Sequence, residues 1–331
     1  MQTVVLGTDT PGQLSAAADR AIDLLKDGEI VALPTETVYG LAANALRPSA
    51  VSKVFEAKAR PEFNPLICHL PDPDWLTLFT QIPPASRELV DRLILAFWPG
   101  PLTLVLPRRD TVPDIVAAGL PTVAVRMSIH PIFREVIERF AKPLAAPSAN
   151  RYSHLSPTKA EHVVKELDGR IGLVLDGGPT VHGVESTIVA VEGDTLRLLR
   201  AGPIPREHLA GFATITEAVP GARPEAPGHA PHHYAPRTPL RLVPFADNVA
   251  GSLKGETGVL AFRGGPKSFR PKVLEVLSTS GDLREAAATL FAKLRHLDES
   301  GCDEIVAEEV PATGIGLAIL DRLRRASASK A

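Results

Sequence analysis

A segment rich in proline, glycine, alanine and histidine divides this chain into two parts, and this division constrains the fold more than any other feature. The segment spans residues 202–239 and is most extreme over residues 220–236, PGARPEAPGHAPHHYAP. Proline and glycine at this density interrupt helices and strands and are typical of linkers. We therefore predict three parts, which are a first domain over residues 1–205, a linker over residues 206–239 and a second domain over residues 240–331.

Helical and strand patterns alternate along the first part. Apolar residues have helical spacing over residues 13–27, and a short apolar strand follows at residues 30–33. Further strands are expected at residues 65–70, 102–106, 122–126, 144–146, 172–175, 186–191 and 195–199, and further helices near residues 49–60, 85–97, 131–140 and 157–168. This order predicts an α/β domain.

The last part of the chain repeats the alternation on a smaller scale. Strands are expected at residues 240–243, 258–262 and 303–307, and helices at residues 283–300 and 316–326. These elements predict a small, Rossmann-like α/β domain, for which we expect a regulatory or cavity-closing role. Gly314 and Gly316 fit either a phosphate-binding turn or a glycine turn before the last helix, and we favour the glycine turn.

Composition narrows the possible functions. The 331 residues carry a net charge of −2, so any contact with nucleic acid must come from a local basic site. Cys68 and Cys302 are the only cysteines, which argues against a disulfide framework or a cysteine-rich zinc site and fits a reducing compartment. The N-terminus lacks a signal-peptide pattern, and no apolar run is long enough to cross a bilayer. We therefore expect a cytoplasmic protein with no membrane partner.

Three cations gather at the end of the second predicted helix. Lys53, Lys58 and Arg60 precede Pro61, which is expected to stop the helix. A guanidinium beside ammonium groups suits a phosphate chain, because Arg donates to two oxygens while Lys supplies a point charge. A solvated basic face is the alternative interpretation, since cations also favour the C-terminal end of a helix dipole.

Five short motifs in the first part resemble those of one known family. Residues 28–42, GEIVALPTETVYGLA, form an apolar strand that breaks at Pro34 before a threonine-rich turn. The other motifs are KARP at residues 58–61, FWPGPLTLVL at 97–106, PSAN at 147–150 and ESTIV at 185–189. In this order they resemble the YrdC-like threonylcarbamoyl-AMP synthase family over residues 12–205. The remainder resembles the long, two-domain branch of that family, which has an extra C-terminal domain behind a linker.

The resemblance implies both a fold and a reaction. It implies a twisted-sheet α/β domain with a basic cavity, followed by the small C-terminal domain. Members of the family join L-threonine, bicarbonate and ATP into threonylcarbamoyl-AMP and pyrophosphate, so a nucleotidyltransferase is expected. Magnesium is expected to arrive on the phosphates of ATP rather than in a protein metal site. The product would serve a downstream tRNA threonylcarbamoyl transferase complex that modifies the adenosine next to the anticodon.

The resemblance also implies roles for individual residues. Lys58 and Arg60 are the expected catalytic residues. The expected ATP-binding residues are Lys58, Arg60, Asn64, Thr122, Ser148, Ser156, Arg200 and Tyr234. The expected threonine-binding residues are Thr35, His69, Arg126, Asn150 and Ser186. Without the resemblance, Ser148 and Asn150 are more typical of turns, Arg126 and Arg200 of strand ends, and His69 of a hydrogen-bonded core histidine.

The linker allows two interpretations. His229, His232 and His233 invite a metal site, but their spacing is nonspecific without cysteine or paired carboxylates, and we expect no metal there. In the long branch the linker folds back over the cavity, so the resemblance implies that Tyr234 contacts the nucleotide or gates access. A passive tether is the alternative.

Two other functions stay open at this point. A nonenzymatic RNA-binding or ribosome-associated module would use the basic site for salt-sensitive contacts with the RNA backbone. The low net charge and the complete motif set argue against this as the main role, although weak RNA binding fits the basic cavity. A carbamoyltransferase related to the same family would carry acylphosphatase and zinc-finger-like segments, and neither is visible in the sequence.

Overall fold

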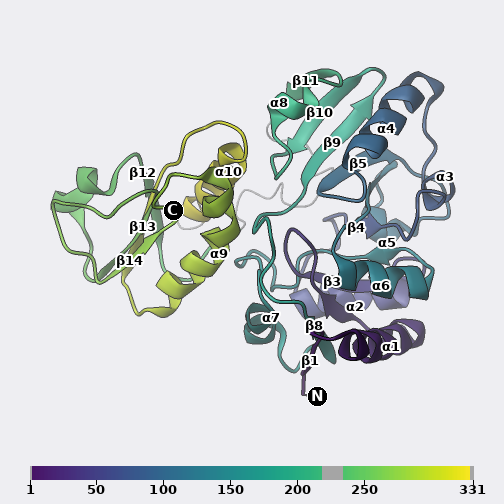
Figure 1. The fold of residues 1–331 in the computed structure, drawn as a ribbon, viewed down its shortest axis with the longest axis horizontal. Coiled ribbons are helices and arrows are strands. Elements are labelled where there is room, and N and C mark those ends of the chain that lie inside the picture. The colour runs from purple at the N-terminus through teal and green to yellow at the C-terminus, as the bar shows by residue number, and fades with distance from the viewer. Residues whose placement is uncertain (1, 218–233, 329–331) are drawn as a thin grey trace.

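The fold is described from a computed structural model for residues 2–217 and 234–328 (Figure 1). These residues form an 11-stranded mixed sheet in the first part of the chain and a four-stranded parallel sheet in the last part. The predicted α/β class is confirmed for both parts. None of the described helices is long and apolar enough to cross a membrane.

The large sheet has the strand order β1-β8-β2-β3-β7-β4-β6-β5-β9-β10-β11. Its strands are β1 (Val4–Gly7), β2 (Val31–Leu33), β3 (Gly40–Asn44), β4 (Ile67–His69), β5 (Leu102–Pro107), β6 (Thr122–Arg126), β7 (Leu144–Ala145), β8 (Leu173–Asp176), β9 (Thr187–Glu192), β10 (Thr195–Arg200) and β11 (Thr214–Glu217). Strands β4 and β6 are parallel neighbours, and His69 is paired in register with Arg126. Because parallel neighbours end at the same edge, this pairing brings two polar side chains together.

Helices cover both faces of the sheet near its N-terminal strands. The helices of the first part are α1 (Pro11–Asp27), α2 (Pro48–Lys58), α3 (Trp75–Phe79), α4 (Pro84–Phe97), α5 (Asp114–Ala117), α6 (Pro131–Phe140), α7 (Ala160–Leu167) and α8 (Arg206–Leu209). In β2, Val31 and Leu33 pack with α1 and α6, whereas Ala32 packs with α2 and α7. Alternate residues of a strand point to opposite faces, so this strand is apolar at every position.

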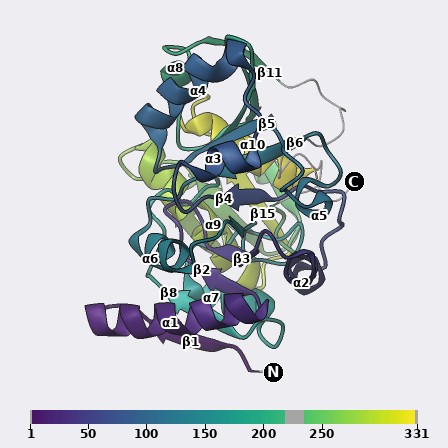
Figure 2. The ribbon, with the colours of Figure 1, turned by 90° about the vertical axis from the view of Figure 1, so that its right-hand side faces the viewer.

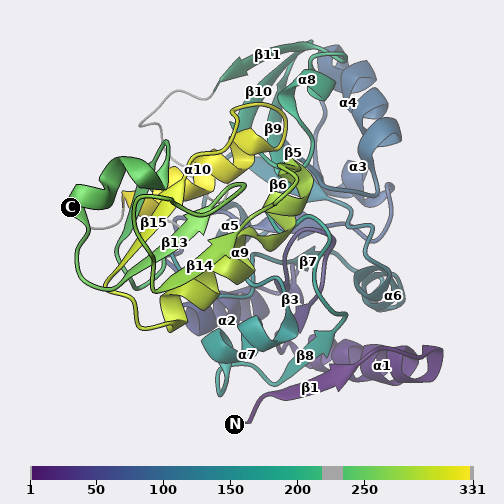
Figure 3. The ribbon, with the colours of Figure 1, turned by 60° about the vertical axis from the view of Figure 1, so that its left-hand side comes forward.

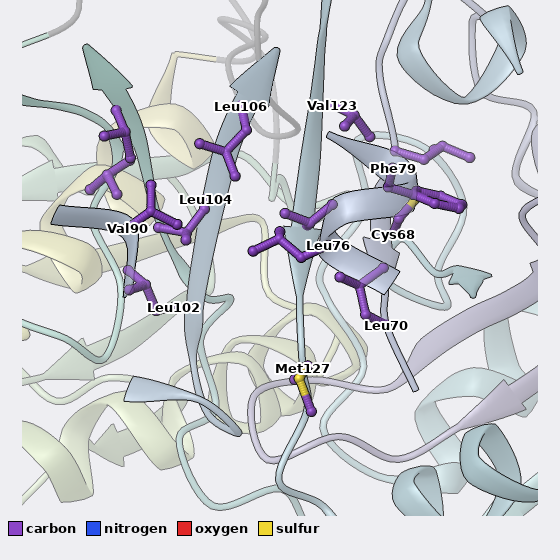
Figure 4. Packing of buried hydrophobic residues seen from close by; sticks show 14 of the residues in the cluster. Cys68, Leu70, Leu76, Phe79, Val90, Leu102, Leu104, Leu106, Val123 and Met127 are labelled. Atoms are coloured by element: carbon purple, nitrogen blue, oxygen red, sulfur yellow. The ribbon is translucent and has the colours of Figure 1, made fainter. Parts of the chain in front are cut away.

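Helices α3 and α4 cover the other end of the sheet (Figure 2). Leu76, Phe79 and Val90 from this layer belong to the same buried cluster as Cys68 and Leu104 of the sheet (Figure 4). Cys68 is a free cysteine, and burial raises its pKa to about 12. The thiol therefore stays protonated and acts as a small apolar packing group.

The small sheet has the strand order β12-β15-β13-β14. Its strands are β12 (Leu240–Val243), β13 (Thr257–Ala261), β14 (Val273–Val276) and β15 (Glu304–Glu308). Helices α9 (Leu283–Glu299) and α10 (Gly316–Ser327) lie between this sheet and the first part of the chain (Figure 1). The 3-10 helix η1 (Ala246–Ser252) packs against the sheet in a separate apolar cluster. Val38, Leu155 and Val184 of the first part belong to the core of α9 and α10. The two parts therefore share an apolar interface.

The structure places the end of the first part later than the sequence predicts. Helix α8 and strand β11 lie within the predicted linker, yet β11 pairs with β10 and extends the large sheet (Figure 3). Leu209 is fully buried and packs in the same core as Ile204. Apolar side chains at these positions outweigh the proline-rich context that suggested a linker. A truncation that keeps this core whole must therefore retain residues up to Glu217, and residues 218–233 lie outside the described part of the chain.

Candidate functional site

A narrow cavity lies at the edge where several strands of the large sheet meet. Its walls come from the turn after β2, the ends of β4, β6 and β10, the segments after β7 and before β9, and Tyr234. The lining residues are Thr35, Thr37, Val38, Gly40, Arg60, Ile67, His69, Arg126, Ala146, Pro147, Ser148, Glu185, Ser186, Arg200 and Tyr234. Its free volume is about 40 Å³, which accommodates a few water molecules. A ligand as large as a nucleotide therefore requires the walls to move.

Most of the predicted site residues meet in this cavity. Those that line it are Thr35, Arg60, His69, Arg126, Ser148, Ser186, Arg200 and Tyr234. Lys58, Asn64, Thr122, Asn150 and Ser156 are not among the lining residues. Thr122 begins β6 at the end opposite to Arg126, about 13 Å away at the usual rise per strand residue. Ser156 adjoins the cavity indirectly, because its hydroxyl donates to the lining residue Glu185 at 2.5 Å.

Lys58 lies behind the cavity wall. Helix α2 ends at this residue, and Ala59 in the left-handed conformation, with φ of 48°, turns the chain toward Arg60. The Lys58 Nζ donates to the carbonyl oxygens of Ser148 and Asn150, each at 2.5 Å. Burial, reinforced by the charge of Arg60, holds the pKa of Lys58 well below its ordinary value. The sequence predicted an ammonium group that projects from the helix end. In the structure, Lys58 is instead buried, and its hydrogen bonds hold the loop that carries Ser148.

Arg60 follows this turn and reaches the cavity. Its Nη2 donates to the carbonyl of Pro65 at 3.2 Å, and its guanidinium carbon lies 5.7 Å from the centre of the Tyr152 ring. Its Nε is buried and has no hydrogen-bond partner within the described part of the chain. Burial lowers the pKa of Arg60 to about 10, so the group is charged at neutral pH. A buried cation with an unused donor is suited to bind an anion.

Arg126 is held by a buried carboxylate. Its Nη2 donates to Glu36 Oε1 at 2.5 Å, its Nη1 donates to Thr37 Oγ1 at 3.1 Å, and its Nε donates to the carbonyl of Gly100 at 3.2 Å. Ser128 Oγ donates to the other oxygen of Glu36 at 2.5 Å. Burial raises the pKa of Glu36, but Arg126 and Ser128 outweigh it, and the net pKa is lowered. A guanidinium has five N–H groups, so about two remain on Arg126 for a ligand.

Ser186 and Arg200 form a second polar pair in the cavity lining. Arg200 Nε donates to the carbonyl of Ser186, and its Nη2 donates to the Ser186 hydroxyl, both at 3.0 Å. The Ser186 hydroxyl also lies 2.8 Å from Thr103 Oγ1 of β5. The pair arises because β9 begins and β10 ends at the same edge of their antiparallel ladder. It places a third guanidinium in the cavity.

Thr35 and His69 complete the polar lining. Thr35 Oγ1 donates to the carbonyl of Val38 at 2.7 Å and accepts from the Thr37 amide, which closes the turn after β2. The His69 ring packs on Phe133 with centres 4.6 Å apart. Burial, followed by the charges of Arg126 and Arg134, holds the pKa of His69 well below its ordinary value. Its imidazole is therefore neutral at neutral pH.

Tyr234 closes the cavity from the side of the small domain. Its side chain is 1% exposed, and its backbone is left-handed, with φ of 63°. The centre of the Tyr234 ring lies 5.7 Å from the centre of the Phe291 ring on α9. It lies 5.2 Å from the guanidinium carbon of Arg322 on α10. His229, His232 and His233 of the linker lie outside the residues that the structure describes. Tyr234, which was expected to contact the nucleotide or gate access, lies within them.

Two family models together cover most of the chain. One, named Sua5/YciO/YrdC and described as "Telomere recombination", matches residues 23–202, which is more than half of the chain. The chain belongs to the Sua5/YrdC family. A second model, "Threonylcarbamoyl-AMP synthase, C-terminal domain", matches residues 204–328. The resemblance drawn from the five motifs, including the two-domain branch, is therefore confirmed.

Relatives in the Sua5/YrdC family match along nearly the whole chain. The threonylcarbamoyl-AMP synthase of Bacillus subtilis is 40% identical and is matched over 98% of this chain and 95% of its own length. The enzyme of Pyrococcus abyssi is 41% identical, with 93% of each chain covered. The crystal structure of P. abyssi Sua5 complexed with L-threonine superposes with a TM-score of 0.87 and covers 99% of this chain and 98% of that one.

Two carboxylates of this Sua5/YrdC protein belong to the site although sequence reasoning assigned no role to them. Glu36 pairs with Arg126, and Glu185 lines the cavity. Both occur inside the quoted motifs, next to Thr35 and Ser186 respectively. Their position inside these motifs is the signal by which the sequence could have identified them.

A second polar contact joins the two parts away from the cavity. Arg295 of α9 donates to Glu166 of α7 at 2.9 Å and to the carbonyl of Leu155 at 2.9 Å. Glu166 also lies 2.8 Å from His154 Nδ1. Burial raises the pKa of Glu166, but the hydrogen bonds and charges of His154 and Arg295 outweigh it and lower the pKa to about 2.

Glu166 is expected to make stability depend on pH at the interface. Its folded pKa is below the ordinary value of 4.5, so its contribution is present above that value and is lost as pH falls toward about 2. The difference corresponds to about 3 kcal/mol. At pH 6, the free energy of unfolding measured in urea should be higher for the wild type than for Glu166→Gln by this amount. The difference between the two proteins should disappear by pH 2. Glu161→Gln on the same helix, with a 63% exposed side chain, is the control, and a gap unchanged with pH contradicts the assignment.

Proposed function

We propose that this chain is an L-threonylcarbamoyl-AMP synthase, which joins L-threonine, bicarbonate and ATP and releases pyrophosphate. The observation that carries the proposal is the convergence of Arg60, Arg126 and Arg200 on one buried cavity. Three guanidinium groups in a space shielded from water suit two anionic substrates that repel each other in solution. Hydroxyl groups of Thr35, Ser148 and Ser186 supply further hydrogen-bonding groups for them.

The polar groups divide into two sets, to which we assign the two substrates. Arg60, Ser148 and Arg200 hold the phosphates of ATP, and Arg60 contributes the donor that has no partner among the described residues. Thr35, His69, Arg126 and Ser186 hold threonine, with the remaining N–H groups of Arg126 directed to its carboxylate. Lys58 and Asn150 act indirectly, because both maintain the loop that carries Ser148. Asn64, Thr122 and Ser156 contact ATP only after a rearrangement of the walls.

The proposed reaction needs no protein nucleophile. The neutral amine of threonine adds to bicarbonate with loss of water and forms a carbamate. A carbamate oxygen then attacks the α-phosphorus of ATP in line, and pyrophosphate leaves with the bridging oxygen. Catalysis comes from holding the carbamate and the α-phosphate together and from cations that stabilise charge on the leaving group. Arg60 is the residue we place nearest to that charge.

Magnesium enters this scheme as part of the substrate. Glu185 is the carboxylate among the lining residues, and it already contacts Ser156 and Arg322. No group of three potential ligands from His, Cys, Asp and Glu occurs in the part of the chain that the structure describes. We propose that the ion is carried on the phosphate oxygens of ATP.

Tyr234 is the proposed gate. The cavity holds about 40 Å³ of free space while this side chain forms one wall, so ATP requires Tyr234 or its neighbours to move. Tyr234 lies directly after the segment expected to fold over the site, and it contacts α9 and α10 of the small domain. The small domain thereby takes the proposed cavity-closing role. The product then passes to a tRNA threonylcarbamoyl transferase in the cytoplasm.

The synthase assignment is tested by pyrophosphate release. Purified protein is incubated with magnesium and ATP, with and without L-threonine and bicarbonate, and pyrophosphate is measured by a coupled assay. We expect release that requires both threonine and bicarbonate, together with a product of the mass of threonylcarbamoyl-AMP. Pyrophosphate release at the same rate without threonine would contradict the proposal.

A further inference from the structure

Arg322 is a fully buried arginine of the small domain that contacts a wall of the cavity. It lies on α10, is 0% exposed, and its Nε donates to Glu185 Oε2 at 3.0 Å. Its Nη1 donates to the carbonyl of Ala201 at 2.9 Å and to Asp321 at 2.9 Å. Glu185 and Ala201 both belong to the first part of the chain, so this side chain joins the two parts at the site.

Glu185 is an unusual member of the cavity lining because it is negatively charged. Its side chain is almost fully buried, and the cavity it faces also contains Arg60 and Arg200. A buried carboxylate is costly unless it is paired, and it attracts nearby cations strongly where water is excluded. A free carboxylate in this position would compete with substrate phosphates for these two guanidinium groups.

The contacts of Glu185 prevent this competition. One carboxylate oxygen accepts from Ser156 Oγ at 2.5 Å and the other accepts from Arg322 at 3.0 Å. Arg200, in contrast, directs its Nε and Nη2 to Ser186. The ion pair that neutralises Glu185 therefore comes from the small domain, whereas Arg60 and Arg200 of the first part line the cavity.

We propose that Arg322 is a positioning residue that neutralises Glu185 from the small domain and so keeps Arg60 and Arg200 available for the triphosphate. This inference rests on the proposed synthase function, since it concerns ATP in the same cavity. It also assigns the small domain an electrostatic role in the site besides that of closing it. Loss of Arg322 should weaken ATP binding by releasing Glu185, and removal of the Glu185 charge should reverse that loss.

The test is the affinity for magnesium ATP measured by calorimetry on the full chain, without turnover. Arg322→Met should weaken ATP binding by about 10-fold or more, whereas L-threonine binding should change by less than about threefold. Glu185→Gln/Arg322→Met should bind ATP within about threefold of wild type, since the competing charge is gone. Arg324→Met, an exposed arginine on the same helix, is the matched control and should bind ATP like wild type.

The Glu185→Gln variant keeps the inference testable if Arg322→Met fails to fold. Its amide oxygen can still accept from Arg322, while its NH2 group faces the Ser156 hydroxyl, which can accept instead. The charge is removed, so we expect ATP binding at least as tight as in wild type. Weaker ATP binding by Glu185→Gln, or a double variant as weak as Arg322→Met, would overturn the inference. So would Arg322→Met binding ATP like wild type. A wild-type protein that binds no ATP would instead overturn the proposed function itself.

Discussion

Replacing Arg60 by alanine is expected to lower kcat/KM for ATP by at least about 100-fold, the largest catalytic effect we foresee for one substitution. Arg60 lines the cavity, is almost fully buried, and has an Nε with no partner among the described residues. The substitution removes the cation that we propose stabilises charge on the leaving pyrophosphate. Threonine-dependent pyrophosphate release at varied ATP concentration measures this effect.

The matched control for Arg60 is Arg151→Ala. Arg151 is exposed, and its backbone carbonyl accepts from the Asn150 side chain and from the His154 amide. Its removal tests whether any nearby arginine influences the reaction through long-range charge. We expect activity within about twofold of wild type for this variant, because exposed charges are screened. Equal losses in Arg60→Ala and Arg151→Ala would show that Arg60 has no specific role.

Replacing Glu36 by alanine is expected to lower the free energy of unfolding by about 3–5 kcal/mol. Glu36 and Arg126 are almost fully buried and lie 2.5 Å apart, so the substitution leaves an unpaired guanidinium in the interior. Ser128 also loses its acceptor. Urea unfolding of the full chain at neutral pH measures the loss.

The double variant Glu36→Ala/Arg126→Met separates the lost charge pair from the lost packing. Because it leaves no buried charge unpaired, it should recover a large part of the stability that Glu36→Ala loses. It should not recover threonine binding, for which Arg126 is the proposed carboxylate partner. If Glu36→Ala lowers the free energy of unfolding by less than about 1 kcal/mol, the pair does not hold this turn in the way we describe.

The position of the cavity could be anticipated from the sequence because its residues follow strands. Arg126 ends one predicted strand, Ser186 begins another, and His69 is the last residue but one of a third. Parallel and antiparallel pairing brings such ends to a common edge. The motifs then identified which polar residues at these ends belong to one site.

Other parts of the site depend on contacts between distant residues, which no local pattern reveals. Lys58 was expected to project toward phosphate. Its Nζ instead contacts two backbone carbonyls that lie 90 and 92 positions away along the sequence. Arg322 lies 137 positions from Glu185, and its surroundings follow from how the two parts pack together. The segment over residues 206–217 was predicted as a linker because proline and glycine surround it, whereas burial of Leu209 and pairing of β11 determine its structure.

The arrangement of the cations also bears on the RNA-binding alternative. Lys58, Arg60, Arg126 and Arg200 are each less than 9% exposed. Binding to an RNA backbone requires cations that reach phosphates on the surface of a helix. Buried cations in a cavity of this size instead suit small anions, so this alternative has no specific support from the site.

The central claim is that the cavity transfers an adenylyl group rather than a phosphoryl group. It is tested most directly with ATP labelled at the α-phosphorus, incubated with the protein, magnesium, L-threonine and bicarbonate. We predict that the label appears in threonylcarbamoyl-AMP, that this requires both threonine and bicarbonate, and that the β- and γ-phosphates leave together as pyrophosphate. Recovery of the label in ADP, with release of inorganic phosphate, would contradict the account.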